Sequence, residues 1–236
     1  MLLALPLLLA AADAPPAALR RGVNITNWFR YPPSGDPAAL RGYLDDAALA
    51  ALRRAGFSFI RLPVQPEMLA ARGPLTEAIA RMQRHGFAVV VALFGSGWHL
   101  ESDAGDQARL LAAWRTLAPL LRRFDPALTY PEVLNEPVFA GDAAGWAALQ
   151  HRAVAVIRDA LPANTIVLTG ADWGSVRGLL ALTPEPDPNV LYSVHLYEPT
   201  ELTALGAYRA GLDRQAMARL PFPATDLAAC LGTAMV

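Results

Sequence analysis

Short apolar segments alternate with amphipathic helical segments along most of the chain, and this alternation constrains the fold most strongly. The middle apolar segments are almost free of polar residues, as expected when helices cover both faces of a parallel sheet. Repeated strand-then-helix units with right-handed crossovers leave two architectures, an open doubly wound sheet or a (β/α)8 barrel. The predicted strands span residues 22–27, 57–62, 87–94, 129–134, 165–169 and 190–196. The predicted helices span residues 44–55, 76–85, 107–123 and 145–161.

Side chains that can take part in catalysis or binding follow the ends of the predicted strands, and this favours the barrel. In a barrel all of these ends meet at one face, where catalytic groups come from several strands. No G-x-G-x-x-G motif follows the first strand, so a dinucleotide-binding sheet has no support. We therefore predict an α/β fold, the (β/α)8 TIM barrel. The residues concerned are Asn27, Trp28, Arg61, Trp98, His99, Asn135, Glu136, Asp172, Trp173, His195 and Tyr197.

The number of strand-helix units is smaller than a whole barrel requires. The pattern predicts six strands, and only 39 residues follow Tyr197. Two further units need roughly 60 to 70 residues at the spacing of the first six, within a typical barrel of ~250 residues. Residues 209–220 resemble part of a loop or helix, and residues 227–236 supply at most one more strand. We expect a barrel domain over residues 15–236 that is truncated after about six units, and is thus incomplete at its C-terminus.

The composition excludes several kinds of chemistry. All 20 cationic residues are arginine, which excludes Schiff-base lysines, pyridoxal phosphate anchoring and the phosphate-loop lysine. The net charge of -1 comes without a basic stripe, so a nucleic-acid partner is not expected. The single cysteine, Cys230, excludes an internal disulfide and a cysteine-built zinc site. No His, Asp or Glu spacing resembles a metal site, so we expect neither a metal nor a cofactor. We also expect a monomer.

The N-terminus has the pattern of a secretory signal peptide. Residues 2–12 form an apolar run that ends in small residues and is shorter than the roughly 20 residues needed to span a bilayer. We expect a signal peptide over residues 1–14, cleaved after Ala12 or Ala14, and a secreted or periplasmic protein. No basic residue precedes the apolar run, so a mis-set start codon or a disordered leader are the alternatives. No later segment is expected to cross a membrane.

The most informative segment is Asn135-Glu136-Pro137, which follows the fourth predicted strand. A glutamate at the mouth of a barrel strand can serve as a general acid. The adjacent asparagine can hold a sugar 2-hydroxyl in the transition state of glycoside hydrolysis. Outside this context the tripeptide is weak evidence, since it also fits a turn whose proline starts a helix.

Several segments in order along the chain carry a family resemblance. They are residues 21–24 at the first strand, 56–63 at the second, 98–99 after the third, 134–137 at the fourth and 194–197 at the sixth. With these segments the chain resembles glycoside hydrolase family 5, the cellulase family, whose members are (β/α)8 retaining glycosidases. The resemblance covers residues of about 21 to 200. It implies hydrolysis of a β-linked glucan or a related polysaccharide.

The resemblance also implies roles for individual residues. Glu136 is the implied acid/base and Asn135 its sugar-binding neighbour. Arg61 supports the nucleophile electrostatically, and His195 and Tyr197 shape the hydrogen-bond network. The implied or candidate substrate-binding residues are His99, Trp98, Trp173, Asn27 and Trp28.

One departure from the family pattern matters for activity. A retaining glycosidase needs two carboxylates about 5 to 5.5 Å apart, and the family's nucleophile is a glutamate at the end of strand seven. The carboxylates after Tyr197 are Glu198, Glu201, Asp213 and Asp226, and none ends an apolar seventh strand. We therefore expect a glycoside hydrolase whose nucleophile is missing from this chain. The alternatives are a catalytically inactive carbohydrate-binding remnant and a truncated product that does not fold stably.

Structural roles compete with the functional ones at several positions. Arg61 can instead pair with a neighbouring carboxylate inside the barrel. His99 can be a loop histidine without a role, and Trp98 and Trp173 can either stack on sugar rings or pack against the protein. His85 and His151 lie in helical segments and are expected at the surface.

Overall fold

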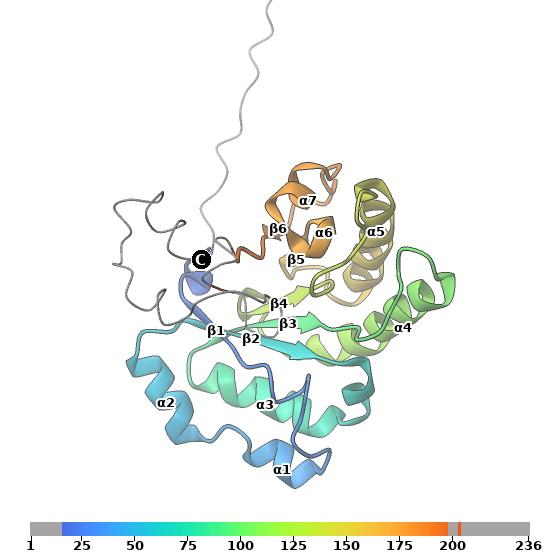
Figure 1. The fold of residues 1–236 in the computed structure, drawn as a ribbon. Helices are drawn as coiled ribbons and strands as arrows, with labels where there is room; N and C mark the ends of the chain where they lie inside the picture. Colours follow the sequence, from blue (N-terminus) through green and yellow to red (C-terminus); the bar gives the residue numbers. More distant parts are fainter. Residues whose placement is uncertain (1–15, 198–202, 204–236) are drawn as a thin grey trace, which may run out of the picture. The chain divides into compact units, whose positions relative to one another are not determined.

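The computed structural model describes residues 16–197 and residue 203, and its chain divides into two compact units, Met1–Val194 and His195–Val236. The first unit contains one sheet of six parallel strands in the order β1-β2-β3-β4-β5-β6 (Figure 1). This half-barrel confirms the predicted α/β fold, with strands in sequence order as in a TIM barrel. The strands are β1 (Gly22–Asn24), β2 (Phe59–Val64), β3 (Ala88–Leu93), β4 (Thr129–Glu132), β5 (Ile166–Thr169) and β6 (Val190–Ser193).

The helices connect successive strands on the outside of the sheet (Figure 1). Aspartate N-caps start the helices at Pro37, Asp46, Ala104 and Ala143, and their carboxylates accept backbone N–H bonds of the first turn. The α-helices are α1 (Pro37–Gly42), α2 (Asp46–Arg54), α3 (Arg72–Arg84), α4 (Ala104–Leu121), α5 (Ala143–Ala160), α6 (Ala171–Gly174) and α7 (Val176–Leu180). Within the described residues the short 3-10 helices are η1 (Ala17–Leu19), η2 (Pro66–Ala70) and η3 (Pro126–Leu128). The short helices α1, α6 and α7 were not predicted, because with 6, 4 and 5 residues they are too short to show apolar periodicity.

Strand β2 does not end at Pro63 as the sequence suggested, but continues to Val64. The carbonyl of Arg61 and the amide of Gln65 bond to the segment that follows β1. Alternate residues of a parallel strand bond to the same neighbour, so the backbone of Pro63 also faces this segment. Between these two bonds no donor is required of residue 63, and a proline is tolerated there.

Alternating strand residues build two cores. The larger one lies between the sheet and the helices and includes Ile60, Leu62, Val89 and Val91. The smaller one lies on the inner face of the sheet and consists of Ala88, Val90, Tyr130 and Val167. The side chains that follow this inner alternation toward the carboxyl ends of the strands therefore reach the mouth of the half-barrel.

Buried tryptophans fix the carboxyl ends of β4 and β5. The indole of Trp114 in α4 donates to the carbonyl of Val133, and the indole of Trp146 in α5 donates to the carbonyl of Thr169, both over 2.8 Å. Each indole is fully buried. Helix packing thus sets the positions of the backbone that carries the candidate site.

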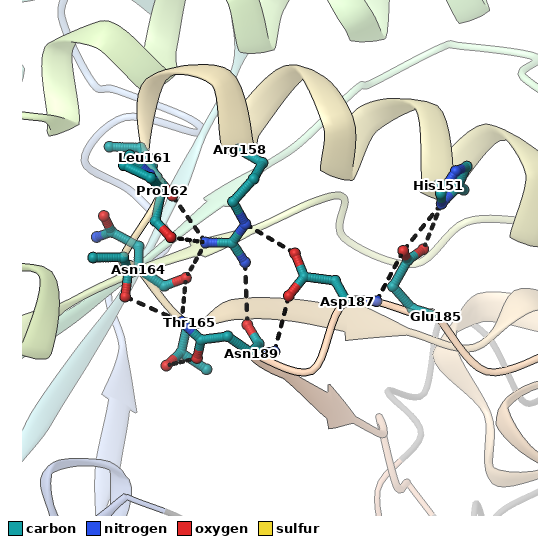
Figure 2. Close-up of polar contacts among 10 residues, drawn as sticks. His151, Arg158, Leu161, Pro162, Asn164, Thr165, Glu185, Asp187 and Asn189 are labelled. Atoms are coloured by element: carbon teal, nitrogen blue, oxygen red, sulfur yellow. Dashed lines mark hydrogen bonds and ion pairs between the residues drawn. The ribbon is translucent and has the colours of Figure 1, made fainter.

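An arginine network holds the opposite end of the sheet (Figure 2). Arg158 of α5 donates to the carbonyls of Leu161, Asn164 and Asn189 and pairs with Asp187 over 2.8 Å. Asn164 and Asn189 precede β5 and β6, so the network lies at the amino-terminal ends of these strands. This face of a β/α barrel serves stability.

Among the described residues, no helix is both long enough and apolar enough to cross a membrane. The predicted signal peptide at residues 1–14 and the predicted segments at 209–220 and 227–236 lie outside the described residues.

Candidate active site

The backbone between β4 and Glu136 contains one extra residue. Within β4, Ala92 of β3 pairs with Glu132, and the amide of Val133 donates to Val167 of β5. The amide of Asn135, rather than that of residue 134, then donates to the carbonyl of Leu93 over 2.8 Å. A regular strand would turn residue 134 toward β3, so the shift of one position marks a β-bulge. Bulges occur at barrel rims and redirect side chains.

The bulge brings Glu132 and Asn135 to one guanidinium. Arg61 donates to both oxygens of Glu132 over 2.8 and 2.5 Å and to the side-chain oxygen of Asn135 over 2.9 Å. Its third nitrogen donates to the side chain of Asn24 over 3.0 Å. The side chains of Arg61 and Glu132 are 18% and 3% exposed, so this is a nearly buried bidentate pair. The structural role considered for Arg61, pairing with a carboxylate inside the barrel, is confirmed.

Glu136 follows this cluster in a strained backbone conformation. Its φ of 47° lies in the left-handed region, where a non-glycine residue costs about 1–3 kcal/mol. The bonds on both sides hold it there. Upstream, Asn135 is fixed to Leu93, and downstream the carbonyls of Pro137 and Val138 accept the amides of Trp173 and Asp172 over 2.9 and 2.7 Å.

The turn after β5 presents an aromatic ring to solvent. Asp172 and Trp173 have φ values of 56° and 58°, and Trp173 is 52% exposed. Arg177 of α7 pairs with Asp172 over 2.5 Å and holds the turn. A pocket of about 340 Å³ lies beside it, lined in part by Phe139, Asp172 and Arg177. Trp173 is thus a half-exposed aromatic residue whose backbone is bonded to the segment that follows Glu136.

Trp28 does not lie at the rim. Its ring is fully buried, stacks on Phe29 and Tyr43, and its indole donates to the carbonyl of Leu40 in α1 over 2.7 Å. The chain after β1 folds back along β2, where Phe29 bridges to Val64, and this carries Trp28 into the helix-facing core. A ring without exposed surface offers nothing for a sugar to stack on, so its position does not support the substrate-binding role predicted for it. Asn27, one residue earlier, is exposed.

The loop after β3 separates Trp98 and His99. Trp98 is partly buried against the helix-facing core and lines a pocket of about 370 Å³ with Glu67 of η2 and Arg109 of α4. His99 has a 73% exposed side chain, and its backbone amide donates to the buried carboxylate of Asp106. The described contacts bring neither residue to Arg61 or Asn135.

His195 and Tyr197 belong to the second unit and are described by themselves. His195 is partly buried, Tyr197 is exposed, and the hydroxyl of Thr203 donates to the carbonyl of Tyr197. The roles inferred for them stay predictions.

Sequence reasoning missed Glu132 as well as the side chains of Arg30 and Phe94 at the strand mouth. Strand alternation could have found Glu132, since it stands two residues after the inward-facing Tyr130. Among residues 16–197 and 203, no group of three or more His, Cys, Asp or Glu side chains is arranged to hold a metal ion.

A parallel half-barrel with an Asn-Glu pair at the carboxyl end of its fourth strand defines a class, the β/α-barrel glycoside hydrolases. The family model of cellulase, glycosyl hydrolase family 5, matches residues 21–218. The chain therefore belongs to glycosyl hydrolase family 5, as its sequence segments suggested.

Two curated relatives support this assignment. Endoglucanase H of Acetivibrio thermocellus is 24% identical over 195 residues, which cover 77% of this chain and 21% of the relative. Endoglucanase 3 of Fibrobacter succinogenes is 24% identical over 232 residues, which cover 87% of this chain and 34% of the relative. The chain thus spans about a fifth to a third of the length of these relatives.

Solved structures agree with the fold. The endoglucanase Cel5A of Thermotoga maritima is 26% identical with a TM-score of 0.72, over 82% of this chain and 66% of that one. Structures of Cel5A from the same organism are in complex with cellobiose, at 26% identity and a TM-score of 0.72, and with mannotriose, at 26% identity and a TM-score of 0.71. The matched parts cover 81% and 80% of this chain and 65% and 64% of those chains.

Proposed function

We propose that this chain carries the acid/base half of a retaining glycosidase that acts on a β-linked glucan or a related polysaccharide. The observation that supports the proposal is the attachment of Asn135 to the Arg61–Glu132 pair, next to the strained Glu136. An immobile amide beside a carboxyl group at a barrel mouth suits the recognition of a sugar hydroxyl next to the bond that is cleaved.

In the proposed mechanism Glu136 donates its proton to the glycosidic oxygen as the bond to the anomeric carbon breaks. The amide nitrogen of Asn135 donates a hydrogen bond to the sugar 2-hydroxyl, a contact that strengthens in the transition state. Arg61 keeps the Asn135 oxygen engaged, so that the amide nitrogen of Asn135 remains directed to the sugar. In the second step Glu136 takes a proton from the water that attacks the anomeric carbon, the bond from that carbon to the second carboxylate breaks, and Glu136 is ready for another turnover.

The second carboxylate of the mechanism is proposed to lie outside this chain. Among the described residues, Glu132 and Asp172 also stand near strand ends, but arginines hold both of them. Glu198, Glu201, Asp213 and Asp226 lie outside the described residues. We propose that none of these is the nucleophile, so the 236-residue chain by itself lacks turnover.

The proposed substrate rests on the relatives. Cel5A structures hold cellobiose and mannotriose, which favours β-linked oligosaccharides as ligands of this chain. Trp173 is the proposed stacking platform, because it is half exposed and its backbone amide bonds to Pro137, the residue after Glu136. His195 and Tyr197 remain proposed members of the hydrogen-bond network, and His99, Trp98 and Asn27 remain proposed contacts of a longer glycan.

We also propose export to the periplasm or the medium, as a monomer. The apolar run and small residues at 2–14 support this proposal. Mass spectrometry of the mature protein should find an N-terminus at Asp13 or Pro15, whereas an intact Met1 on cytoplasmic protein contradicts it.

The test of function supplies the absent nucleophile from solution. Phenyl β-cellobioside is mixed with the chain in the presence of azide, a small anion that can attack the anomeric carbon. The bond between that carbon and the phenolic oxygen breaks, Glu136 gives its proton to the leaving oxygen, and a glycosyl azide and phenol result. Glu136→Gln should lower this rate by roughly 10²–10⁴-fold, because phenol is a poor leaving group without protonation. The control is Glu67→Gln, which alters an exposed carboxylate in η2.

The outcomes separate the parts of the proposal. Turnover without azide contradicts the absence of a nucleophile but leaves Glu136 as the acid. Equal rates for the native chain and Glu136→Gln contradict the role of Glu136. Binding of cellobiose with no turnover in either condition favours the inactive carbohydrate-binding remnant.

A further inference from the structure

Four residues continue the strands at the same level of the barrel mouth. Phe29 bridges to Val64, Val64 pairs with Leu93, and the carbonyl of Leu93 accepts the amide of Asn135. The residues that follow are Arg30, Gln65, Phe94 and Glu136. Arg30 and Phe94 therefore stand along the rim that ends at the proposed acid/base.

Arg30 and Phe94 point to the inner side of this rim. Phe29, Val64 and Leu93 all belong to the core under the helices. Since successive strand side chains face opposite sides, the residues after them face the mouth. The contact between Arg30 and Phe94 agrees, because the guanidinium carbon lies 3.3 Å from the centre of the Phe94 ring.

Aromatic rings hold the guanidinium in place. Besides Phe94, the ring of Tyr31 lies 4.6 Å from the guanidinium carbon, and the Tyr31 hydroxyl accepts a hydrogen bond from Arg30 over 3.1 Å. Tyr31 and Phe94 meet edge to face at 6.3 Å, and Tyr31 is 50% exposed. A guanidinium stacked in this way keeps its N–H groups in the plane of the fork, where they can bind a planar oxyanion.

The charge of Arg30 has no carboxylate partner within the described part of the chain, and its Nε is buried without an acceptor. Glu132, the buried carboxylate of the inner face, already accepts two hydrogen bonds from Arg61. A buried donor without a partner costs about 1–3 kcal/mol, and aromatic contacts compensate a guanidinium only in part. Within the described residues the charge of Arg30 thus lacks a counterion, which a ligand can provide at the terminal N–H groups.

We propose that Arg30 and Phe94 form a subsite for a sugar that carries a carboxylate, a uronic acid residue within or attached to the β-linked glycan. The proposal rests on the proposed function, since it assigns the substrate class of the same mouth. The carboxylate of the sugar accepts hydrogen bonds from the terminal N–H groups of Arg30, and a sugar face lies on the half-exposed ring of Tyr31. A neutral glucosyl unit would satisfy the donors with hydroxyls but would leave the charge uncompensated.

The test compares two disaccharides that differ at one carbon. Cellobiose carries a CH2OH group at C6 of its non-reducing unit, and cellobiouronic acid carries a carboxylate there. Calorimetric titration of the chain should find the acid bound about 10- to 100-fold more tightly than cellobiose, the range of a charged hydrogen-bonded contact. The preference should weaken in salt raised from about 0.01 M to about 1 M, because ions screen the contact.

Variants connect this preference to Arg30. Arg30→Gln should abolish it, and Arg30→Lys, which keeps the charge but lacks the fork, should retain only a part. Arg122→Gln is the matched control, because it removes one exposed arginine at the end of α4 and should leave the preference intact. Thermal unfolding of each variant shows which of them are folded, and Arg30→Lys carries the test if Arg30→Gln does not fold.

Three results would overturn the inference. Equal affinities of the native chain for the two disaccharides would contradict the uronic acid subsite but leave the proposed β-glycosidase function in place. A preference that survives in Arg30→Gln, or disappears in Arg122→Gln, assigns it to another charge. Binding of neither disaccharide also removes the proposed glycan site, whereas failure of azide-dependent turnover alone affects only the proposed catalysis.

Discussion

Glu132 and Asn135 accept hydrogen bonds from the same nitrogen of Arg61, although three positions separate them along the chain. In a regular strand residues i and i+3 face opposite sides, so one of the two would point to the helices. The extra residue between the bonds to Val167 and Leu93 removes this conflict. The bulge is therefore the feature that joins a buried ion pair to the asparagine beside the proposed acid.

The ion pair should be costly to break from one side. Glu132→Gln leaves the charge of Arg61 nearly buried and should lower the free energy of unfolding by about 3–5 kcal/mol. Arg61→Gln combined with Glu132→Gln should recover part of this loss, because no uncompensated charge remains. Urea unfolding of both single variants and the double variant measures the coupling. Strictly additive losses would show that the pair does not act as a unit.

The left-handed backbone of Glu136 should lower the stability of the fold. Its φ of 47° favours glycine, so Glu136→Gly should be more stable than Glu136→Ala by about 1 kcal/mol, while both lose proton transfer. At Glu67 in η2, where the left-handed region is not used, the order should reverse. Thermal unfolding of the four variants makes the comparison. The same order at both positions would contradict strain at Glu136.

The strand-helix alternation and the position of Asn135 and Glu136 could be predicted because both depend on local sequence patterns. The bulge could not, since it follows from bonds to Leu93 and Val167 on two other strands. Trp28 was misjudged for a similar reason. An aromatic residue after a strand usually lies at the rim, but here the chain folds back along β2 and α1 covers the ring. Tertiary contacts decided these positions, and no local pattern encodes them.

The network of Arg158 should support the fold without affecting the mouth of the barrel. Arg158→Ala removes the donor to Asp187 and to four backbone carbonyls, and we expect a loss of about 2–4 kcal/mol in the free energy of unfolding. Azide-dependent turnover of the folded protein should not change, since the network lies at the amino-terminal ends of β5 and β6. Arg122→Ala is the control for the loss of an exposed arginine. A fall in turnover at unchanged stability would contradict this separation.

Stability should decline at alkaline pH because of Tyr130. Burial in the inner core, with a smaller contribution from Asp125, raises the pKa of the Tyr130 hydroxyl above its ordinary value of 10.0. The unfolded chain then loses this proton at a lower pH than the native protein. The stabilising contribution is complete below about pH 10 and is lost as the pH rises through the raised native pKa.

Tyr130→Phe should lose about 1 kcal/mol at neutral pH, because the bond from the hydroxyl to the carbonyl of Ala127 is gone. It should also show a smaller alkaline decline than the native chain. Urea unfolding from about pH 8 to about pH 11 tests this, with Tyr31→Phe as the control at an exposed ring. Identical declines for the native chain and Tyr130→Phe would show that Tyr130 does not govern the alkaline transition.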